Sequence, residues 1–178
     1  MEIFDVLNEY GEFTGKTATR EECHKKGYWH RAVYAFIIDD KGNVLLQKRS
    51  ASKKLWPNLW DATVGGHVDS GEFGRQALIR EAKEELGIQI VDEDIKYLLG
   101  STSVNIKGDI VNKHYNECYL ITKSIDISDI VLQKEEVAEV KYFSKEELIK
   151  RINNNYENLT DKTGVWNFLK IILEKYIA

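Results

Sequence analysis

The feature that most constrains this sequence is a glycine-rich turn followed by an acidic helical segment, between Gly65 and Ile88. From about Phe73 to Leu86 there is no proline and most residues favour helix, so the segment predicts an α-helix. Gly87 suits the position just after a helix end. The helix is expected to pack on a core through an apolar stripe formed by Leu78, Ile79, Ala82 and Leu86.

Three glutamates, Glu81, Glu84 and Glu85, lie beside that stripe at a spacing that places them within one helical turn. A solvated face, with Arg80 and Lys83 as partners, is one interpretation of such a run. Like charges on one face cost about a few tenths of a kcal/mol per pair unless a cation bridges them. Hard divalent cations such as Mg²⁺ take oxygen ligands. The spacing therefore permits a metal site without requiring one.

The same stretch resembles the Nudix box, G-x5-E-x7-R-E-U-x-E-E-x-G-U, through Gly66, Glu72 and the run Arg80–Ile88. Every fixed position matches, although Ala82 is smaller than the aliphatic residue usual there. The resemblance implies a hydrolase of diphosphate linkages that uses Mg²⁺, with Mn²⁺ as a substitute. By the same resemblance Glu81, Glu84, Glu85 and the backbone carbonyl of Gly66 hold the metal, and one glutamate acts as base. Glu72 and Arg80 would orient these carboxylates.

Composition limits the other classes of function. The chain has 178 residues with a formal net charge of −4, which suits one soluble domain and gives no electrostatic footprint for nucleic acid. Cys23 and Cys118 are far apart, so no disulfide framework is visible and a cytoplasmic setting is expected. We see no apolar run long enough for a membrane span, and the acidic N-terminal segment lacks the features of a signal peptide.

Alternating apolar and polar runs predict strands on both sides of the acidic helix, hence an α/β or α+β protein with a mixed sheet. The expected elements are an N-terminal hairpin over 1–16, a helical turn within 17–28, strands over 29–39, 44–48, 61–64, 88–91, 95–105, 111–122 and 137–143, and helices over 145–153 and 161–177. Ser144 and Glu147 have the spacing of a capping box at the start of the helix over 145–153.

The Nudix resemblance adds the specific architecture: a mixed β-sheet sandwiched between α-helices, with the N-terminal hairpin as an arm. We expect a single domain over 1–178, divided into an arm (1–28), a core (29–145) and C-terminal helices (146–178).

Similarity beyond the box, over roughly residues 1–145, is to the isopentenyl-diphosphate isomerase-like branch, most clearly in the segment RSASKKLWPNLW. By the resemblance, an isomerase needs a cysteine before the Gly-His of the turn, where this chain has Gly65, and a later glutamate, which Glu117 would supply. The isomerase's histidine-rich metal site is only partly matched. His30 and His67 stand at positions of isomerase metal ligands. An expected upstream histidine aligns near Cys23, where His24 could substitute, and an expected glutamate aligns near Tyr115.

The intact box favours hydrolysis over the two alternatives, an isomerase-like enzyme and a non-catalytic nucleotide-binding module. Arg49 and Lys53 match positions that contact diphosphate in the isomerases, and with Glu117 they are the expected substrate-binding residues. His30 and His67 are interpreted first as hydrogen-bonded structural side chains. The expected partner is a small diphosphate, and a homodimer is a further possibility. Three aromatic residues could stack on a base or fill the core: Tyr34, Trp56 and Trp60.

Overall fold

A computed structural model describes residues 1–160 and 163–176 of the chain. Its centre is a mixed sheet of nine strands, in which β3 pairs antiparallel with β1, β4 and β6 and parallel with β8. The strands are β1 (Ile3–Leu7), β2 (Phe13–Thr19), β3 (Trp29–Ile38), β4 (Val44–Arg49), β5 (Trp60–Asp61), β6 (Val64–His67), β7 (Ile95–Lys107), β8 (Ile110–Thr122) and β9 (Val137–Phe143).

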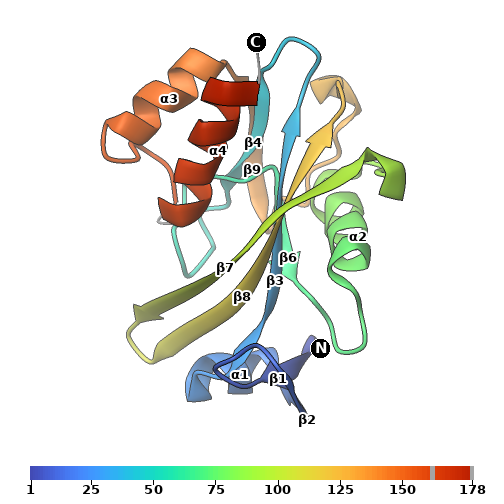
Figure 1. Ribbon diagram of the computed structural model, residues 1–178, viewed down its shortest axis with the longest axis vertical. Helices are drawn as coiled ribbons and strands as arrows, with labels where there is room; N and C mark the ends of the chain where they lie inside the picture. The colour runs from blue at the N-terminus through green and yellow to red at the C-terminus, as the bar shows by residue number, and fades with distance from the viewer. Residues whose placement is uncertain (161–162, 177–178) are drawn as a thin grey trace.

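Helices cover both faces of this sheet (Figure 1). Helix α2 (Gly74–Leu86) packs on one face, where alternate residues of β3 such as Val33 and Ile37 join its apolar side. Helices α3 (Lys145–Asn153) and α4 (Thr163–Tyr176) pack on the other face, around Trp166 and the intervening β3 residue Phe36. Alternate side chains of β3 therefore belong to two separate hydrophobic cores, one on each face of the sheet, as expected of a strand buried on both faces.

The N-terminal arm lies at one end of the sheet, below β3 and β8 in Figure 1. Strands β1 and β2 form a hairpin, and β1 joins the main sheet through the single pair Leu7–Trp29. Helix α1 (Arg20–Lys26) follows, starting at a capping box between Thr19 and Glu22 and ending at Gly27 in the left-handed conformation. The long hairpin β7–β8 reaches the same end of the molecule.

The predicted fold, a mixed sheet sandwiched by helices with a hairpin arm, is confirmed. One predicted strand is wrong: residues 88–91 form no strand, because the chain leaves α2 and turns through a short 3₁₀ helix, Asp92–Asp94, into β7. The strand expected over 61–64 is instead two short ones, β5 and β6, and β6 carries Gly65 and Gly66 into the sheet itself.

Smaller differences concern the C-terminal helices. Ser144 caps α3 through the amide of Glu147, but the Glu147 carboxylate pairs with Arg151 instead of completing the capping box. The helix expected over 161–177 is α4, and residues 161, 162 and 177 lie outside the described part of the chain. A second short 3₁₀ helix, Ile127–Asp129, precedes β9. Among the described residues, no helix combines the length and apolar character that crossing a membrane demands.

Candidate active site

The glycine turn brings strand β6 into close contact with helix α2. Gly65 and Gly66 pair with Tyr34 and Val33 of β3, so both glycines are part of the sheet. A Cβ at Gly66 would lie well under 3.0 Å from the Glu81 carboxyl group. Only glycine therefore allows the carboxylate of Glu81 to lie directly on the backbone of this strand.

Helix α2 presents an acidic residue on its buried face. Leu78, Ala82 and Leu86 are buried as predicted, but Ile79 is only partly buried. Glu85 lies on the core-facing side and is 7% exposed. The apolar stripe expected from the spacing is therefore interrupted by a carboxylate at the end nearest to Gly65.

Glu85 is held by neutral donors. Its Oε2 accepts hydrogen bonds from the amide Nε2 of Gln47 at 3.1 Å and from the backbone N–H of Gly65 at 3.3 Å. Burial, reinforced by the nearby charge of Glu81, raises the pKa of Glu85 to about 8. Among residues 1–160 and 163–176, no basic side chain is a hydrogen-bond partner of Glu85. A buried carboxylate in that situation is costly to keep ionised, and a cation would remove that cost.

Glu81 is the second partly buried carboxylate, with 12% of its side chain exposed. Burial raises the pKa of Glu81 to about 7, although the guanidinium of Arg80 opposes that shift. Glu84, one turn from Arg80, is by contrast half exposed. The three glutamates thus range from nearly buried to open, along one side of the helix.

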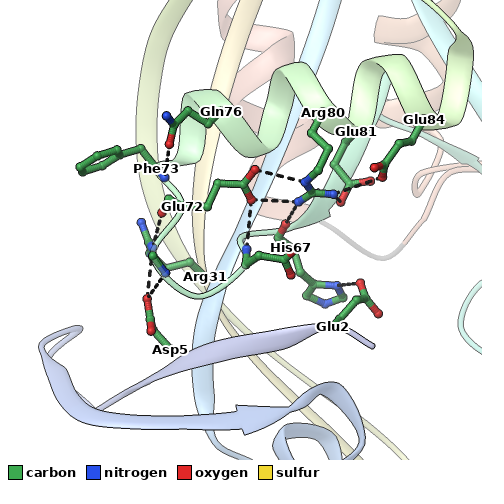
Figure 2. A network of polar contacts seen from close by, with 12 residues as sticks. Glu2, Asp5, Arg31, His67, Glu72, Phe73, Gln76, Arg80, Glu81 and Glu84 are labelled. Carbon is green, nitrogen blue, oxygen red and sulfur yellow. Dashed lines mark hydrogen bonds and ion pairs between the residues drawn. The ribbon is translucent and has the colours of Figure 1, made fainter.

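Arg80 links these carboxylates to the loop before the helix (Figure 2). Its Nε and Nη2 donate to the two oxygens of Glu72 at 3.1 and 3.0 Å, a bidentate pair. Its Nη1 donates to Glu81 at 2.8 Å and to Glu84 at 3.2 Å, and Nη2 also donates to the backbone oxygen of His67 at 3.0 Å. Arg80 therefore fixes loop, helix and strand relative to one another.

We name Glu72, Glu81, Glu84 and Glu85 the carboxylate cluster. In the described part of the chain, the Arg80 guanidinium pairs with three of these four acids and Glu85 has only neutral donors, which leaves three negative charges in excess when all four are ionised. Their oxygens do not converge on one point: among residues 1–160 and 163–176, only a group of histidines has ligand atoms all within 4.8 Å of one another. Like-charge repulsion and the inserted Arg80 account for this spread. Hard oxygen donors, excess negative charge and the small Gly66 together fit a divalent cation such as Mg²⁺.

Arg49 and Lys53, the expected diphosphate-binding residues, are both engaged with acids. Arg49 donates to Asp61 at 3.2 Å and to the backbone oxygen of Leu55 at 3.1 Å, which orders the β4–β5 loop. Lys53 pairs with Glu136, whose charge contributes to the raised pKa of Glu85. The loop that carries Lys53 therefore lies beside the buried end of the carboxylate cluster. Binding of phosphate to Lys53 would require exchange of Glu136 for the substrate.

Glu117 lies at the other end of helix α2. A Cβ at Gly74, the first residue of α2, would overlap the Glu117 carboxyl group. Glu117 also accepts a hydrogen bond of 2.5 Å from Tyr119 and lies 3.9 Å from Arg31. Arg31 in turn donates to the backbone oxygen of Glu72 at 2.7 Å. These contacts support a role in positioning the start of α2, and substrate binding by Glu117 stays a prediction.

The aromatic residues considered for base stacking differ in exposure. Tyr34 and Trp60 are each 8% exposed and belong to the core on the α3–α4 face, where Trp60 packs edge-on against Phe143. Trp56 lies in the β4–β5 loop with a φ of 48° and is partly exposed. Of these three aromatic side chains, Trp56 is therefore the one that is exposed enough to stack on a ligand.

His30 and His67 lie in a group of histidines that the isomerase resemblance indicated only in part, with His24 left open as a member and without His114. His30 makes the expected structural hydrogen bond, from Nδ1 to the backbone oxygen of Tyr28 at 2.9 Å. Both also lie with His24 and His114 in one cluster. His114 was missed, although a signal existed: Asn112, His114 and Asn116 alternate along β8 and are all buried, so one face of this strand is polar.

Comparison with known proteins places these features in a family context. The family profile described as NUDIX domain matches residues 28–163. A Nudix hydrolase of Listeria monocytogenes is 40% identical over 148 residues, which is 83% of each chain. Nudix hydrolase 3 of Arabidopsis thaliana is 37% identical over 151 residues, 82% of this chain but 20% of that longer protein. The crystal structure of DR0079 from Deinococcus radiodurans matches with a TM-score of 0.71 at 23% identity, covering 98% of both chains.

Proposed function

Because the chain belongs to the Nudix domain family, whose hydrolases act on pyrophosphate bonds, we propose that it cleaves a diphosphate linkage in a nucleotide or related molecule by water attack at phosphorus. We propose Mg²⁺, replaceable by Mn²⁺, as its cofactor. The observation that carries the proposal is the buried carboxylate of Glu85 beside that of Glu81, both against the Gly65–Gly66 backbone.

In this proposal Glu81, Glu84, Glu85 and the backbone carbonyl of Gly66 hold the cation. A bound divalent cation neutralises charge that develops on phosphate oxygens and makes water a stronger acid. Glu85 and Glu81 are the inner ligands because they are the least exposed. The open position of Glu84 suits a ligand that completes the site once phosphate has entered.

The chain's own residues supply positioning and proton transfer. The Glu72–Arg80 pair keeps the helix and the glycine turn at a fixed separation, through the bidentate contact and the bond to the His67 carbonyl. One carboxylate of the cluster takes the proton of the attacking water. Lys53, released from Glu136, contacts the phosphate on the side away from the carboxylates.

An isomerase activity is less well supported, because the residue at the position of the isomerase cysteine is a glycine. That position is Gly65, and a Cβ there would lie 2.9 Å from the Tyr34 ring. A non-catalytic module is disfavoured because all box glutamates are present. Neither alternative accounts for a buried acid such as Glu85 next to a glycine turn.

The test is a hydrolysis screen of the full chain with Mg²⁺ or Mn²⁺ and a panel of nucleoside diphosphates, triphosphates, diphosphate-linked nucleotides and isopentenyl diphosphate. We expect release of phosphate or of a nucleoside monophosphate from at least one compound. Glu85→Gln should lower turnover about 10³-fold, since a ligand to a catalytic cation contributes several kcal/mol.

Glu93→Gln is the matched control, because Glu93 is exposed in the 3₁₀ helix after α2. This variant should retain full turnover and the same dependence on Mg²⁺. Full activity of Glu85→Gln, or conversion of isopentenyl diphosphate to its allylic isomer without phosphate loss, would refute the proposal.

A further inference from the structure

One face of the β7–β8 hairpin carries polar side chains where the interior of a sheet protein is normally apolar. Three consecutive cross-strand pairs on this face are polar on both strands: Asn105 with Asn112, Ser103 with His114, and Ser101 with Asn116. Asn112 is 6% exposed and Asn116 is 4% exposed. We name Asn112 and Asn116, together with Ser101 and Ser103, the asparagine row.

Both asparagines of the row hold buried acceptors. Within residues 1–160 and 163–176, the Oδ1 atoms of Asn112 and Asn116 are buried and accept no hydrogen bond. The other end of the Asn116 amide is engaged, because its Nδ2 donates to the Oγ of Ser103 at 3.1 Å and to that of Ser101 at 3.4 Å. The serines therefore orient this amide. A buried acceptor without a donor is costly, so the row suits a ligand group that donates hydrogen bonds.

The row shares a face of the sheet with Gly65. Asn116 pairs with Ala32 of β3, and Gly65 pairs with Tyr34, two residues farther along the same strand. Directly opposite residues of paired strands project to the same side, so these four residues lie on one face. Two strand spacings of about 4.8 Å and two residues of about 3.3 Å place Asn116 on the order of 12 Å from Gly65. That separation is comparable to the span of a diphosphate joined to a sugar.

Tyr34 connects the row to the carboxylate cluster. A Cβ at Gly65 would lie 2.9 Å from the Tyr34 ring, so the ring packs on the glycine backbone that Glu85 binds. Burial raises the pKa of the Tyr34 hydroxyl, and the charge of Glu85 adds to that shift. On its other side Tyr34 pairs with Cys118, two residues from Asn116 on β8. A substrate whose diphosphate is held near Glu85 can therefore extend along this face toward the row.

The hairpin also meets the loop that carries Lys53. The Nζ of Lys107, near the hairpin tip, donates to the backbone oxygen of Lys54 at 2.8 Å, in the loop between β4 and β5 (Figure 1). The serines of the row are partly exposed, whereas its asparagines are buried. A ligand can therefore approach the amides from the β7 side. A phosphate bound by Lys53 would lie in the loop that borders this hairpin.

We propose that the asparagine row determines specificity, and that Asn112 and Asn116 accept hydrogen bonds from sugar hydroxyl groups of the substrate. This inference rests on the proposed function, which places the diphosphate at the carboxylate cluster. Hydroxyl groups are donors that match neutral amide oxygens, whereas ionised phosphate oxygens only accept. A prenyl chain would cover both amide oxygens without a donor, so the row discriminates against it.

Isothermal titration calorimetry of the full-length protein tests the row. Ca²⁺ replaces Mg²⁺ so that turnover does not interfere, and the probes are inorganic diphosphate, ADP, ADP-ribose and isopentenyl diphosphate. Wild type should bind ADP-ribose at least about tenfold more tightly than inorganic diphosphate. Asn116→Leu should weaken ADP-ribose binding at least about tenfold and leave inorganic diphosphate binding within about twofold. Isopentenyl diphosphate should bind to this variant at least as tightly as to wild type.

The two nucleotide probes distinguish which sugar occupies the row. An equal loss for ADP and ADP-ribose in Asn116→Leu assigns the row to the ribose of the nucleoside. A loss for ADP-ribose alone assigns it to the terminal ribose. Either pattern supports the proposal.

Two further variants keep the test informative. Ser103→Ala removes a partly exposed hydroxyl that orients the Asn116 amide, so it serves if Asn116→Leu fails to fold, and it should weaken ADP-ribose binding about threefold. Thr102→Ala is the matched control, because Thr102 lies next to Ser103 on β7 but is exposed on the opposite face. Its affinity for every probe should equal that of wild type.

The outcomes separate this inference from the proposed function. Normal binding of inorganic diphosphate, with the same ADP-ribose affinity in wild type, Asn116→Leu and Ser103→Ala, would overturn the role of the row alone. An equal loss for all four probes would also overturn it, since that pattern indicates a structural role. A wild-type protein that binds none of the probes would overturn the proposed function and this inference together.

Discussion

The carboxylate cluster and the cluster of His24, His30, His67 and His114 meet at adjacent residues of β6, yet they have opposite chemistry. Gly66 contacts Glu81, and His67 next to it belongs to the histidines. The carboxylates are spread apart, carry excess negative charge and include the half-exposed Glu84. The histidines are close together, and burial lowers the pKa of each one for which a shift is resolved.

This contrast shows how one short strand separates two side-chain environments of different character. Spread, charged oxygens suit a hard ion that keeps waters and shares ligands with phosphate, as a reaction requires. The converging histidines instead pack against one another and against Phe4 in an enclosed site. Gly66 and His67 are consecutive residues, so the packing of His67 against Phe4 also positions the strand on which the Glu81 carboxylate lies.

The largest effect on hydrolysis is expected from a substitution at Gly66, where the carboxylate cluster contacts β6. Gly66→Ala places a methyl group where the Glu81 carboxylate lies, so this acid is displaced and hydrolysis should fall about 100-fold or more. Steady-state kinetics with Mg²⁺ measure this. Gly71→Ala would be a poor control because its φ is positive, whereas Gly164→Ala is suitable because no atom lies within 4 Å of the added Cβ and its φ is ordinary. Unchanged kinetics in Gly66→Ala would contradict the close contact.

Arg80→Lys should have an intermediate effect. Lysine keeps the charge but cannot make the bidentate bond to Glu72 while also reaching Glu81 and the His67 carbonyl. We expect hydrolysis to fall about 10- to 100-fold. The apparent affinity for Mg²⁺, measured by titration of activity, should weaken as well. Arg75→Lys is the matched control, since Arg75 lies on the same helix and pairs with Asp92 outside the cluster. Equal losses in both variants would point to a general loss of helix stability.

The smallest expected effect is a pH dependence of stability that distinguishes the two clusters. Because the pKa of Glu85 is raised to about 8 in the folded state, the folded protein binds its proton more tightly than the unfolded chain does. Stability of the metal-free protein should therefore fall as pH rises from about 6.5 to about 8, lowering Tm by roughly 5 °C. Glu85→Gln should reduce this dependence and leave the part that the raised pKa of Glu81 contributes, and Mg²⁺ should raise Tm more at the upper end of the range.

Differential scanning calorimetry in chelator and in Mg²⁺ measures these curves. The histidines act in the opposite direction: their lowered pKa means that the unfolded chain binds protons more tightly, so their contribution to stability is lost on acidification below about pH 6.5. A pH profile that is the same for wild type and Glu85→Gln would contradict the burial of this acid.

The two clusters also show which parts of a site a sequence can reveal. The carboxylates come from one continuous stretch, so the spacing of Glu81, Glu84 and Glu85 on a helix and the position of Gly66 could be predicted. Helix capping at Ser144, the N-terminal hairpin and most strands follow from similarly local patterns. The burial of Glu85 could not be predicted, because it depends on Gln47 from a distant strand.

The histidine cluster spans residues 24 to 114 and exists only through the strand register, notably the parallel pairing of His30 with His114. Spacing in the sequence says nothing of such a pairing. The engagement of Lys53 with Glu136, 83 residues later, was hidden for the same reason. The strand predicted over 88–91 failed for a different reason. Its apolar residues Ile88 and Ile90 are buried in the core, but the segment does not join the sheet, so a local apolar pattern predicted burial correctly and strand pairing wrongly.

The most direct test of the central claim, that α2 and the Gly65–Gly66 turn form a divalent-cation site, is a crystal of the protein soaked in Mn²⁺ and measured for anomalous scattering. We predict an anomalous peak within coordination distance of Glu81, Glu85 and the Gly66 carbonyl oxygen, with the Arg80 guanidinium moved off Glu81 and still bound to Glu72. A fully loaded crystal with no peak there, or with Arg80 still lying between Glu81 and Glu84, would contradict it.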